Sequence, residues 1–288
     1  VVVPTFNRAY LLPRTLRSIE AQTYRDFEVV VVDDGSKDCT PDLVSEWRRT
    51  VNFPVQYLKQ ANQGRHAAMN TGVRNAKGFF IVFLDSDDKL TPEALDRLMH
   101  HWNQIPEDDK AKFAGVEGLC ADIETGKISG RQFPKDVFDS NYLETRKSYH
   151  VGGEKKRSVR TEIHRLFPFP MIPEEKYMRP SVTWNRIAHH YKFRYINEII
   201  QLIEYQNDGL NANRFQVRLN NPKGLRLYYY EEIVFNQDYN SFSSLMKCYA
   251  KYIRYSLHSG IGLKHQLIET PRKIMWLINI LPGLIGWM

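Results

Sequence analysis

Two apolar segments of the sequence each end abruptly in a cluster of carboxylates. Residues 27–32 (FEVVVV) are followed by residues 33–34 (DD), and residues 79–84 (FFIVFL) by residues 85–88 (DSDD). Apolar runs of this length, rich in β-branched and aromatic residues, predict strands buried on both faces, as in a parallel sheet covered by helices. Ligands bind beyond the carboxyl ends of such strands, so we expect both acidic clusters to face one crevice.

The first hundred residues alternate between strand and helix patterns. Helix starts are marked by a hydroxyl residue followed by proline, at Thr40-Pro41 and at Thr91-Pro92. This alternation predicts an α/β fold, Rossmann-like, with a mainly parallel sheet flanked by helices and a C-terminal helical appendage. We predict strands over residues 1–3, 27–32, 55–58 and 79–84, a hairpin with its turn at 125–126, a helix over 181–191, two short strands within 193–203, and a largely helical tail beyond 222.

The composition is that of a folded protein, with a formal net charge of +7 over 288 residues. This excess of Lys and Arg indicates an anionic partner or simply a solvated basic surface, and no nucleic-acid-binding motif is present. The three cysteines are far apart and form no CxxC pair, so a reducing cytosol is the expected environment. No signal peptide pattern is present, and because the chain opens inside an apolar run we expect natural residues before Val1.

Several carboxylates in one crevice repel one another, and a divalent cation shared with a diphosphate would relieve that repulsion. The alternative is that a strand-end aspartate only caps the following turn. Two clusters, one with Asp-x-Asp spacing, favour the functional interpretation. The intervening loop, residues 62–66 (NQGRH), leads into a predicted helix, where free N–H groups favour an anion and Arg65 adds a positive charge.

Four motifs together resemble the family-2 glycosyltransferases with a GT-A fold. These motifs are residues 3–8 (VPTFNR), 32–36 (VDDGS), 62–72 (NQGRHAAMNTG) and 83–88 (FLDSDD), in the family's order and with fitting gaps. The match covers roughly the first 105 residues strongly and the remainder more weakly.

The resemblance implies a donor site for a nucleotide-diphosphate sugar, with uridine as the expected nucleoside. Asp85 would contact the ribose or the metal, and Asp87 would ligate the metal, Mn²⁺ or Mg²⁺, that stabilises the leaving diphosphate. Arg65 would assist near the phosphates. The residues expected to contact or position the nucleotide are Pro4, Thr5, Asn7, Asp33, Asp34, Asn62, Gly64, Arg65, Asp85, Ser86 and Asp87.

An inverting transfer also needs a base to take the proton of the acceptor hydroxyl. The resemblance places this acid shortly before the helix predicted at 181–191, where relatives carry an acid at the position of Pro180. We therefore expect Glu175, or else Glu174, to serve as the catalytic base, although both fit a solvated loop equally well. Asp122 is a further candidate for a sugar-binding acid.

Residues 274–288 (IMWLINILPGLIGWM) are mostly apolar but too short to span a bilayer. With Trp276, Trp287 and the preceding Arg272 and Lys273, they fit an interfacial membrane anchor. A helix docked on the protein's own core fits equally well. An anchor would suit a lipid-linked acceptor and would place a cytoplasmic enzyme at the inner face of the cell membrane.

We expect residues 1–105 to form the nucleotide-sugar half of one GT-A domain, 106–215 its acceptor half, and 216–288 a helical region. The predicted activity is metal-dependent, inverting transfer of a hexose or N-acetylhexosamine to a glycan or lipid-linked hydroxyl. Two alternatives remain open. One is a degenerate transferase kept as a binding or scaffold subunit, which Pro180 favours. The other is a sugar nucleotidyltransferase, which would need a Gly-rich loop after the first strand where this chain has residues 4–8 (PTFNR).

Overall fold

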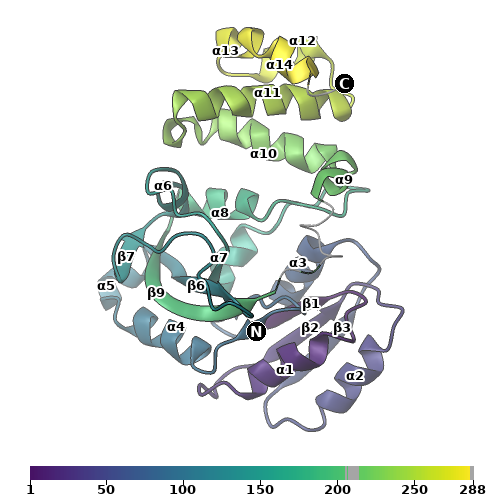
Figure 1. Cartoon of the computed structure of the whole chain (residues 1–288), viewed down its shortest axis with the longest axis vertical. Helices are drawn as coiled ribbons and strands as arrows, with labels where there is room; N and C mark the ends of the chain where they lie inside the picture. The colour runs from purple at the N-terminus through teal and green to yellow at the C-terminus, as the bar shows by residue number, and fades with distance from the viewer. Residues whose placement is uncertain (205, 207–213, 286–288) are drawn as a thin grey trace.

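The computed structural model describes residues 1–204, 206 and 214–285. Two sheets with flanking helices form the larger part of the molecule, and a stack of helices from the C-terminal third lies beside it (Figure 1). The α/β fold with a C-terminal helical appendage is therefore confirmed.

The first sheet is parallel and follows the predicted alternation. Its strands are β1 (Val2–Thr5), β2 (Val29–Asp33) and β3 (Val55–Lys59), in the order β1-β2-β3, and they alternate with α1 (Leu12–Glu20), α2 (Thr40–Trp47) and α3 (Arg65–Asn75). Successive side chains of a strand point to opposite faces. Val3 and Val31 accordingly share a core with α1, α2 and α4, whereas Val2 and Val30 share the other core with α3.

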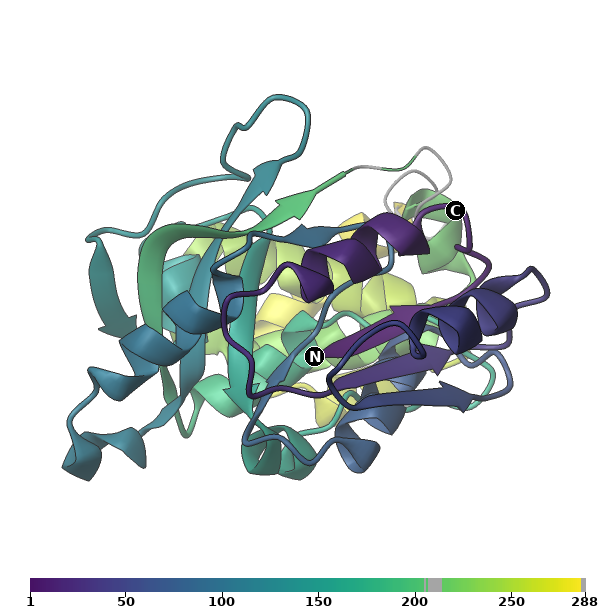
Figure 2. The same cartoon turned by 90° about the horizontal axis from the view of Figure 1, so that it is seen from below.

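The second sheet is mixed, and a parallel bridge between Val2 and Phe83 joins it to the first. Its strands are β4 (Phe80–Val82), β5 (Lys89–Leu90), β6 (Phe113–Asp122), β7 (Val137–Ser140), β8 (Lys155–Arg160) and β9 (Lys192–Ile203), in the order β4-β8-β6-β9-β5, with β7 on β9. The accompanying helices are α4 (Ala94–Asn103), α5 (Glu107–Lys110), α6 (Tyr142–Lys147), α7 (Thr161–Leu166) and α8 (Ser181–Ala188). Seen from below, the parallel strands and the mixed sheet lie side by side (Figure 2).

Two local predictions differ from the structure. The turn at 125–126 is present, but its return segment makes only an isolated bridge, Ala121 to Ile128, because β8 and β9 flank β6 instead. The two strands predicted within 193–203 are one twelve-residue strand, β9. The pairing of β9 with β6 shifts register at several points, and these shifts bend the strand. The apolar pattern of the sequence is interrupted at the bend, which is why two strands were predicted.

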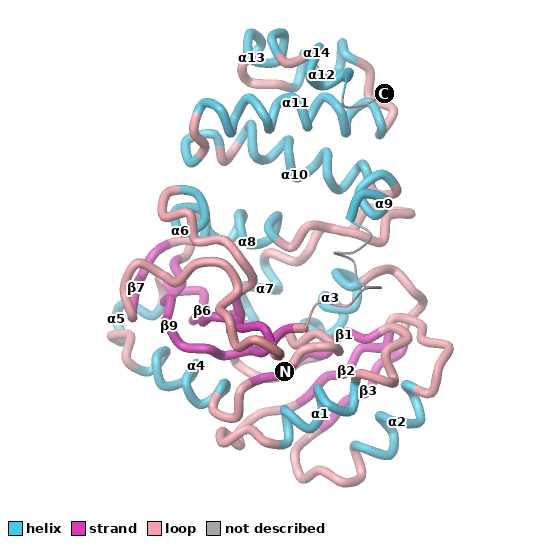
Figure 3. The backbone as a smooth tube through the Cα atoms, in the orientation of Figure 1, coloured by secondary structure: helices cyan, strands magenta, loops and turns pink. Residues whose placement is uncertain are grey.

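The C-terminal helices have a core of their own. They are α9 (Arg214–Leu219), α10 (Pro222–Val234), the short η1 (Gln237–Tyr239), α11 (Phe242–His258), α12 (Leu263–Glu269), α13 (Lys273–Ile278) and α14 (Ile280–Ile285). Tyr229, Tyr249, Ile253 and Trp276 are among the residues buried between them. Figure 3 shows this all-helical stack apart from the strands. None of the helices in the described part has both the length and the apolarity that a bilayer span requires.

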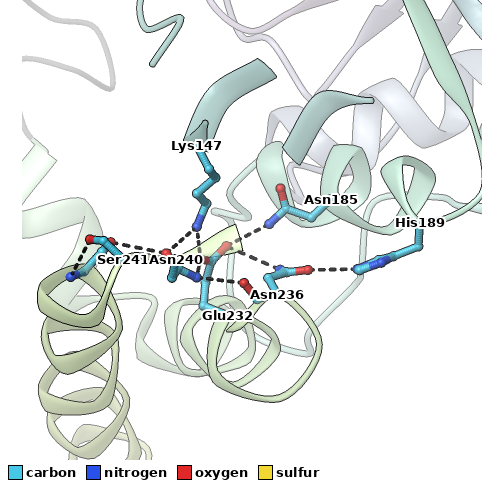
Figure 4. Close-up of polar contacts among 8 residues, drawn as sticks. Lys147, Asn185, His189, Glu232, Asn236, Asn240 and Ser241 are labelled. Carbon is cyan, nitrogen blue, oxygen red and sulfur yellow. Dashed lines mark hydrogen bonds and ion pairs between the residues drawn. The ribbon is translucent and has the colours of Figure 1, made fainter. Parts of the chain in front are cut away.

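A fully buried carboxylate, Glu232 on α10, joins the helical stack to the α/β part (Figure 4). It accepts hydrogen bonds from Lys147 at the end of α6 and from Asn185 Nδ2 of α8 at 2.9 Å. Asn240 Nδ2 donates to the same carboxylate at 3.1 Å. A buried charge is tolerated only when it is paired and hydrogen-bonded, so this junction fixes how α10 sits on α6 and α8.

Candidate active site

The loops that follow β1 and β2 are tied together at the carboxyl end of the parallel sheet. Asn7, whose φ of 52° lies in the left-handed region, donates from its backbone N–H to Ser36 Oγ at 2.9 Å. Its side-chain Oδ1 accepts from the N–H of Lys37 at 2.8 Å. The adjacent Thr5 is buried beside Pro4, and within the described residues its Oγ1 has no partner. The loops of the first two motifs thus form one wall of the candidate site.

The carboxylates of Asp33 and Asp34 are buried and hydrogen-bonded inside the protein. Asp33 accepts from the N–H of Ser36 at 2.7 Å and from the hydroxyl of Tyr57 at 2.6 Å. Asp34 accepts from the N–H groups of Gln63 at 3.0 Å and Gly64 at 2.7 Å. Both side chains therefore shape the loops at the carboxyl end of the parallel sheet, as the capping alternative predicts. Direct contact with a nucleoside remains a prediction.

The third and fourth motifs meet in an ion pair at the start of α3. Arg65 donates from Nε and Nη2 to the two carboxylate oxygens of Asp85, at 2.6 and 2.8 Å. Each side chain is about one-third exposed, at 33% and 30%, so the pair lies at an accessible edge. The neighbouring Gly64 has a φ of 93°, and the backbone of Asn62 packs against Gly35.

Burial and mutual repulsion act on the remaining acids of the fourth motif. Burial, followed by the charge of Asp85, raises the pKa of Asp87. The same causes raise the pKa of Asp88 to about 8, and Gln201 Nε2 donates to Asp88 at 2.6 Å. The intervening Ser86 is buried. Asp85 is thus the acid that Arg65 neutralises, whereas Asp87 and Asp88 both have a raised proton affinity.

Strand β8 and the residue just before it bring Lys156 and Glu154 to the same edge, and no local motif marks either residue. Because β8 runs antiparallel to β4, its first residues lie beside the end of β4. Lys156 is buried and donates to the carbonyl of Phe83. Glu154 is exposed as a residue, but partial withdrawal of its carboxylate from water, followed by the charge of Asp85, raises its pKa. The pairing of distant strands, rather than a local motif, creates this contact.

Comparison with known proteins agrees with this arrangement. Residues 1–111 match the profile of Glycosyl transferase family 2. The chain is 27% identical to the GalNAc(5)-diNAcBac-PP-undecaprenol beta-1,3-glucosyltransferase of Campylobacter jejuni, over 98% of its own length and 93% of that relative. Residues 1–111 thus belong to the family-2 glycosyltransferases.

Two further relatives of the glycosyltransferase match over a smaller share of the chain. An undecaprenyl-phosphate 4-deoxy-4-formamido-L-arabinose transferase of Pseudomonas fluorescens is 38% identical over 34% of the chain and 30% of its own length. An uncharacterized glycosyltransferase of Nostoc is 35% identical over 38% of both proteins.

Solved structures show that the transferase has the GT-A fold. Staphylococcus aureus TarS 1–349, in complex with UDP-GlcNAc, superposes with a TM-score of 0.62 at 16% identity, over 99% of this chain and 88% of that one. The mannosyltransferase PcManGT of Pyrobaculum calidifontis, in complex with GDP-Man and Mn²⁺, gives a TM-score of 0.58 at 20% identity, over 99% and 85%.

In the part of the chain predicted to bind the acceptor, Glu175 is buried and lies at the N-terminus of α10. Its two carboxylate oxygens accept from the N–H groups of Lys223 at 2.6 Å and Gly224 at 2.7 Å. Burial raises the pKa of Glu175, and these two N–H groups oppose that rise. Glu174 is exposed and has a φ of 71°. Within the described residues, neither glutamate pairs with Arg65 or Asp85, and their role as a base stays a prediction.

The segment that carries these glutamates nevertheless touches the start of α3. A Cβ added to Gly64 would lie 2.0 Å from the carbonyl oxygen of Lys176. Pro180 is the N-cap residue of α8. Asp122 accepts from the hydroxyl and N–H of Thr125 at 2.7 and 2.8 Å, so its carboxylate closes a turn.

The prediction of a membrane anchor needs the tryptophans of the C-terminal segment to be exposed, but one of them is buried. Trp276 is 3% exposed and belongs to the core of the helical stack. Trp287 lies outside the described residues. The exposed apolar residues of this region are instead Ile268, Ile274, Leu277, Ile278, Leu281 and Ile285.

Proposed function

We propose that this transferase moves a sugar from a nucleotide-diphosphate donor, with UDP as the nucleotide, to the hydroxyl of a glycan or lipid-linked acceptor, with inversion. The observation that carries this proposal is the pairing of Arg65 with Asp85 beside Asp87. An N-terminal helix end and a guanidinium favour phosphate, whereas adjacent carboxylates favour a cation. A diphosphate with its metal satisfies both requirements at once.

The residues at this edge fit a divalent cation. Carboxylate oxygens are the ligands that Mg²⁺ and Mn²⁺ prefer, and such sites use one or two carboxylates together with substrate phosphates. Within the described ranges, no three His, Cys, Asp or Glu side chains are grouped so as to hold a metal alone. Asp87 and Asp85 would hold the ion, and when bound it would stabilise negative charge on the leaving diphosphate.

The loops of the first two motifs would hold the nucleoside. Asp33 and Asp34 already fix the backbone at Ser36 and Gly64. The planar nucleobase would therefore bind against this wall with little rearrangement of the protein. We propose that Pro4, Thr5 and Asn7 line this wall. The buried Thr5 Oγ1, which has no partner among the described residues, is a ready donor or acceptor for a ligand.

Glu154 is our first candidate for the base, ahead of Glu175 and Glu174. A base must be ionised and must reach the acceptor hydroxyl beside the donor. Glu175 would have to release two backbone N–H groups before it could act. Glu154 lies at the edge that carries Asp85, and its raised pKa suits proton uptake.

A lipid-linked acceptor is supported by the Campylobacter relative, whose name describes an undecaprenol-PP substrate. The exposed apolar residues of α12 to α14, with the exposed Arg272 and Lys273, would rest on an anionic membrane surface. We propose that the transferase works in this way at the inner face of the cell membrane.

Thermal unfolding with nucleotides tests the donor assignment. UDP, UDP-GlcNAc and GDP-Man should be compared with and without Mn²⁺, since a ligand that binds only the native state raises its stability. At about 100 times Kd the native state gains about 2.7 kcal/mol. We expect the largest shift with a uridine ligand and Mn²⁺. Equal shifts with all nucleotides, or none, would contradict the proposal.

The alternative is a transferase that binds its donor without turning it over, because Pro180 stands where the family resemblance implies an acid. Hydrolysis of the donor in the absence of acceptor distinguishes an active transferase from one that only binds its donor. A bound but intact nucleotide sugar would favour the scaffold role.

A further inference from the structure

Arg179, in the segment before α8, is a guanidinium without an acidic partner. Its Cζ lies 4.1 Å from the ring centroid of Tyr228 on α10. Within residues 1–204, 206 and 214–285, no carboxylate pairs with Arg179, and its side chain makes no hydrogen bond. The aromatic ring supports one face of the guanidinium and leaves its five N–H donors for another group.

The surroundings keep this side chain charged. Burial lowers the pKa of Arg179, but the neighbouring phenols of Tyr228, Tyr229 and Tyr177 raise it. An arginine that is partly withdrawn from water, with unused donors, is costly unless a ligand completes its hydrogen bonds.

The same region has an excess of positive charge. Arg146 and Arg157 lie 5.2 and 5.3 Å from the ring of Tyr142, which also faces Arg179. The buried Glu117 is the acid for two of these cations, with Nε of Arg157 at 2.6 Å and Nη2 of Arg146 at 3.8 Å. Three guanidiniums and one carboxylate leave two positive charges in excess, which attract an anion.

This region lies close to the start of α3. Lys176, whose carbonyl abuts Gly64, precedes Arg179 by three residues, a chain reach of at most about 11 Å. The N–H groups at the start of α8 follow at once, and Ser181 Oγ is a buried atom without a partner among the described residues. A guanidinium, a hydroxyl and a helix N-terminus are groups that bind phosphate.

We infer that Arg179, Ser181 and the N-terminus of α8 form a subsite for a phosphate of the acceptor. The inference rests on the proposed function and deepens it. The acceptor would be a sugar joined to its carrier by a phosphate or pyrophosphate close to the hydroxyl that receives the transfer. The donor diphosphate has its own cation in Arg65, which follows Gly64 and pairs with Asp85.

Two acceptors with the same sugar test the subsite. N-acetylglucosamine linked to a short polyprenyl pyrophosphate is compared with the uncharged octyl glycoside, using the donor found by thermal unfolding. In Arg179→Gln, the KM for the pyrophosphate acceptor should rise about tenfold, as expected for loss of a charge-assisted hydrogen bond. The KM for the donor should stay unchanged, and Arg179→Lys should restore part of the affinity for the pyrophosphate acceptor. An equal rise in donor KM, or no rise in acceptor KM, overturns the inference.

Lys223→Gln is the matched control, because it removes one positive charge from an exposed side chain on α10. It should leave the preference for the pyrophosphate acceptor unchanged, and an equal loss there would overturn the inference. Calorimetry with inorganic pyrophosphate, after saturation with UDP, gives a readout that needs no transfer. Binding by the unsubstituted protein but not by Arg179→Gln supports the subsite even if no acceptor is glycosylated, whereas equal binding overturns it. Melting temperatures of all variants verify that they are folded.

Discussion

Arg65 engages both carboxylate oxygens of Asp85 and none of Asp87, which lies two residues further on. The two acids of the Asp-x-Asp motif therefore differ before any ligand binds. One is held by a permanent cation, and the other has a pKa raised by burial and by the charge of its neighbour. This difference predicts unequal roles for the two acids.

Replacing Asp87 by Asn should abolish metal-dependent turnover while leaving the fold intact. The substitution removes a negative charge from a repulsive cluster, so we expect an unchanged or slightly raised melting temperature. The dependence of donor hydrolysis on Mn²⁺ concentration measures the effect. Asp108→Asn, an exposed acid on α5, is the control. Retained Mn²⁺-dependent activity in Asp87→Asn would contradict the metal assignment.

Two substitutions, Glu154→Gln and Glu175→Gln, should show which glutamate is the catalytic base and which only caps a helix. If Glu154 is the base, kcat/KM falls as pH drops through its raised pKa, because the protonated acid cannot accept a proton. Glu154→Gln should lower kcat by about 10² or more and remove this acidic limb. Glu175→Gln should keep the pH profile and lose about 1 kcal/mol of stability, since α10 loses a charged acceptor at its first turn. The reverse pattern would identify Glu175 as the base.

Gly64→Ala should be far more damaging than Gly126→Ala. Both glycines have positive φ, 93° and 68°, so both substitutions incur about 1–2 kcal/mol of backbone strain. Only at position 64 would the new Cβ meet backbone, at 2.0 Å from the carbonyl oxygen of Lys176, whereas position 126 has open space. We expect an additional 1–3 kcal/mol, roughly, for Gly64→Ala in urea unfolding, together with weaker UDP binding. Similar losses for the two variants would contradict the close approach of the two segments.

Replacing Ile274, Leu277, Ile278 and Leu281 together by Asn should release the protein from anionic vesicles. Each residue is more than half exposed, so the substitutions remove apolar contact with lipid without opening the core. Co-sedimentation with phosphatidylglycerol vesicles should show at least about a tenfold loss of partitioning. Leu166→Asn, another exposed apolar residue, should bind like the unsubstituted protein. Unchanged sedimentation of the fourfold variant would remove the membrane proposal.

The sequence predicted the parallel half of the fold because each of its elements is encoded locally. The valines of β2 alternate between two cores, and the residues that follow them are the polar groups of the crevice. The positions of Glu154 and Lys156 could not be predicted in the same way, because they depend on β8 pairing with β4 across more than seventy residues. The cap that Glu175 makes on α10 and the burial of Trp276 likewise arise from tertiary packing. Local motifs therefore predicted the residues expected to bind the nucleotide, whereas contacts made by tertiary packing could be found only in the structure.

The contact of Glu175 with Lys223 and Gly224 also bears on how the protein can be divided. A fragment that stops before α10 would strip a buried carboxylate of both its donors, on a segment whose carbonyl rests against Gly64. Such a fragment would contain every family motif and would still be disturbed at the place where a diphosphate is expected to sit. For expression and crystallisation, the helices after residue 221 should therefore be kept with the catalytic part.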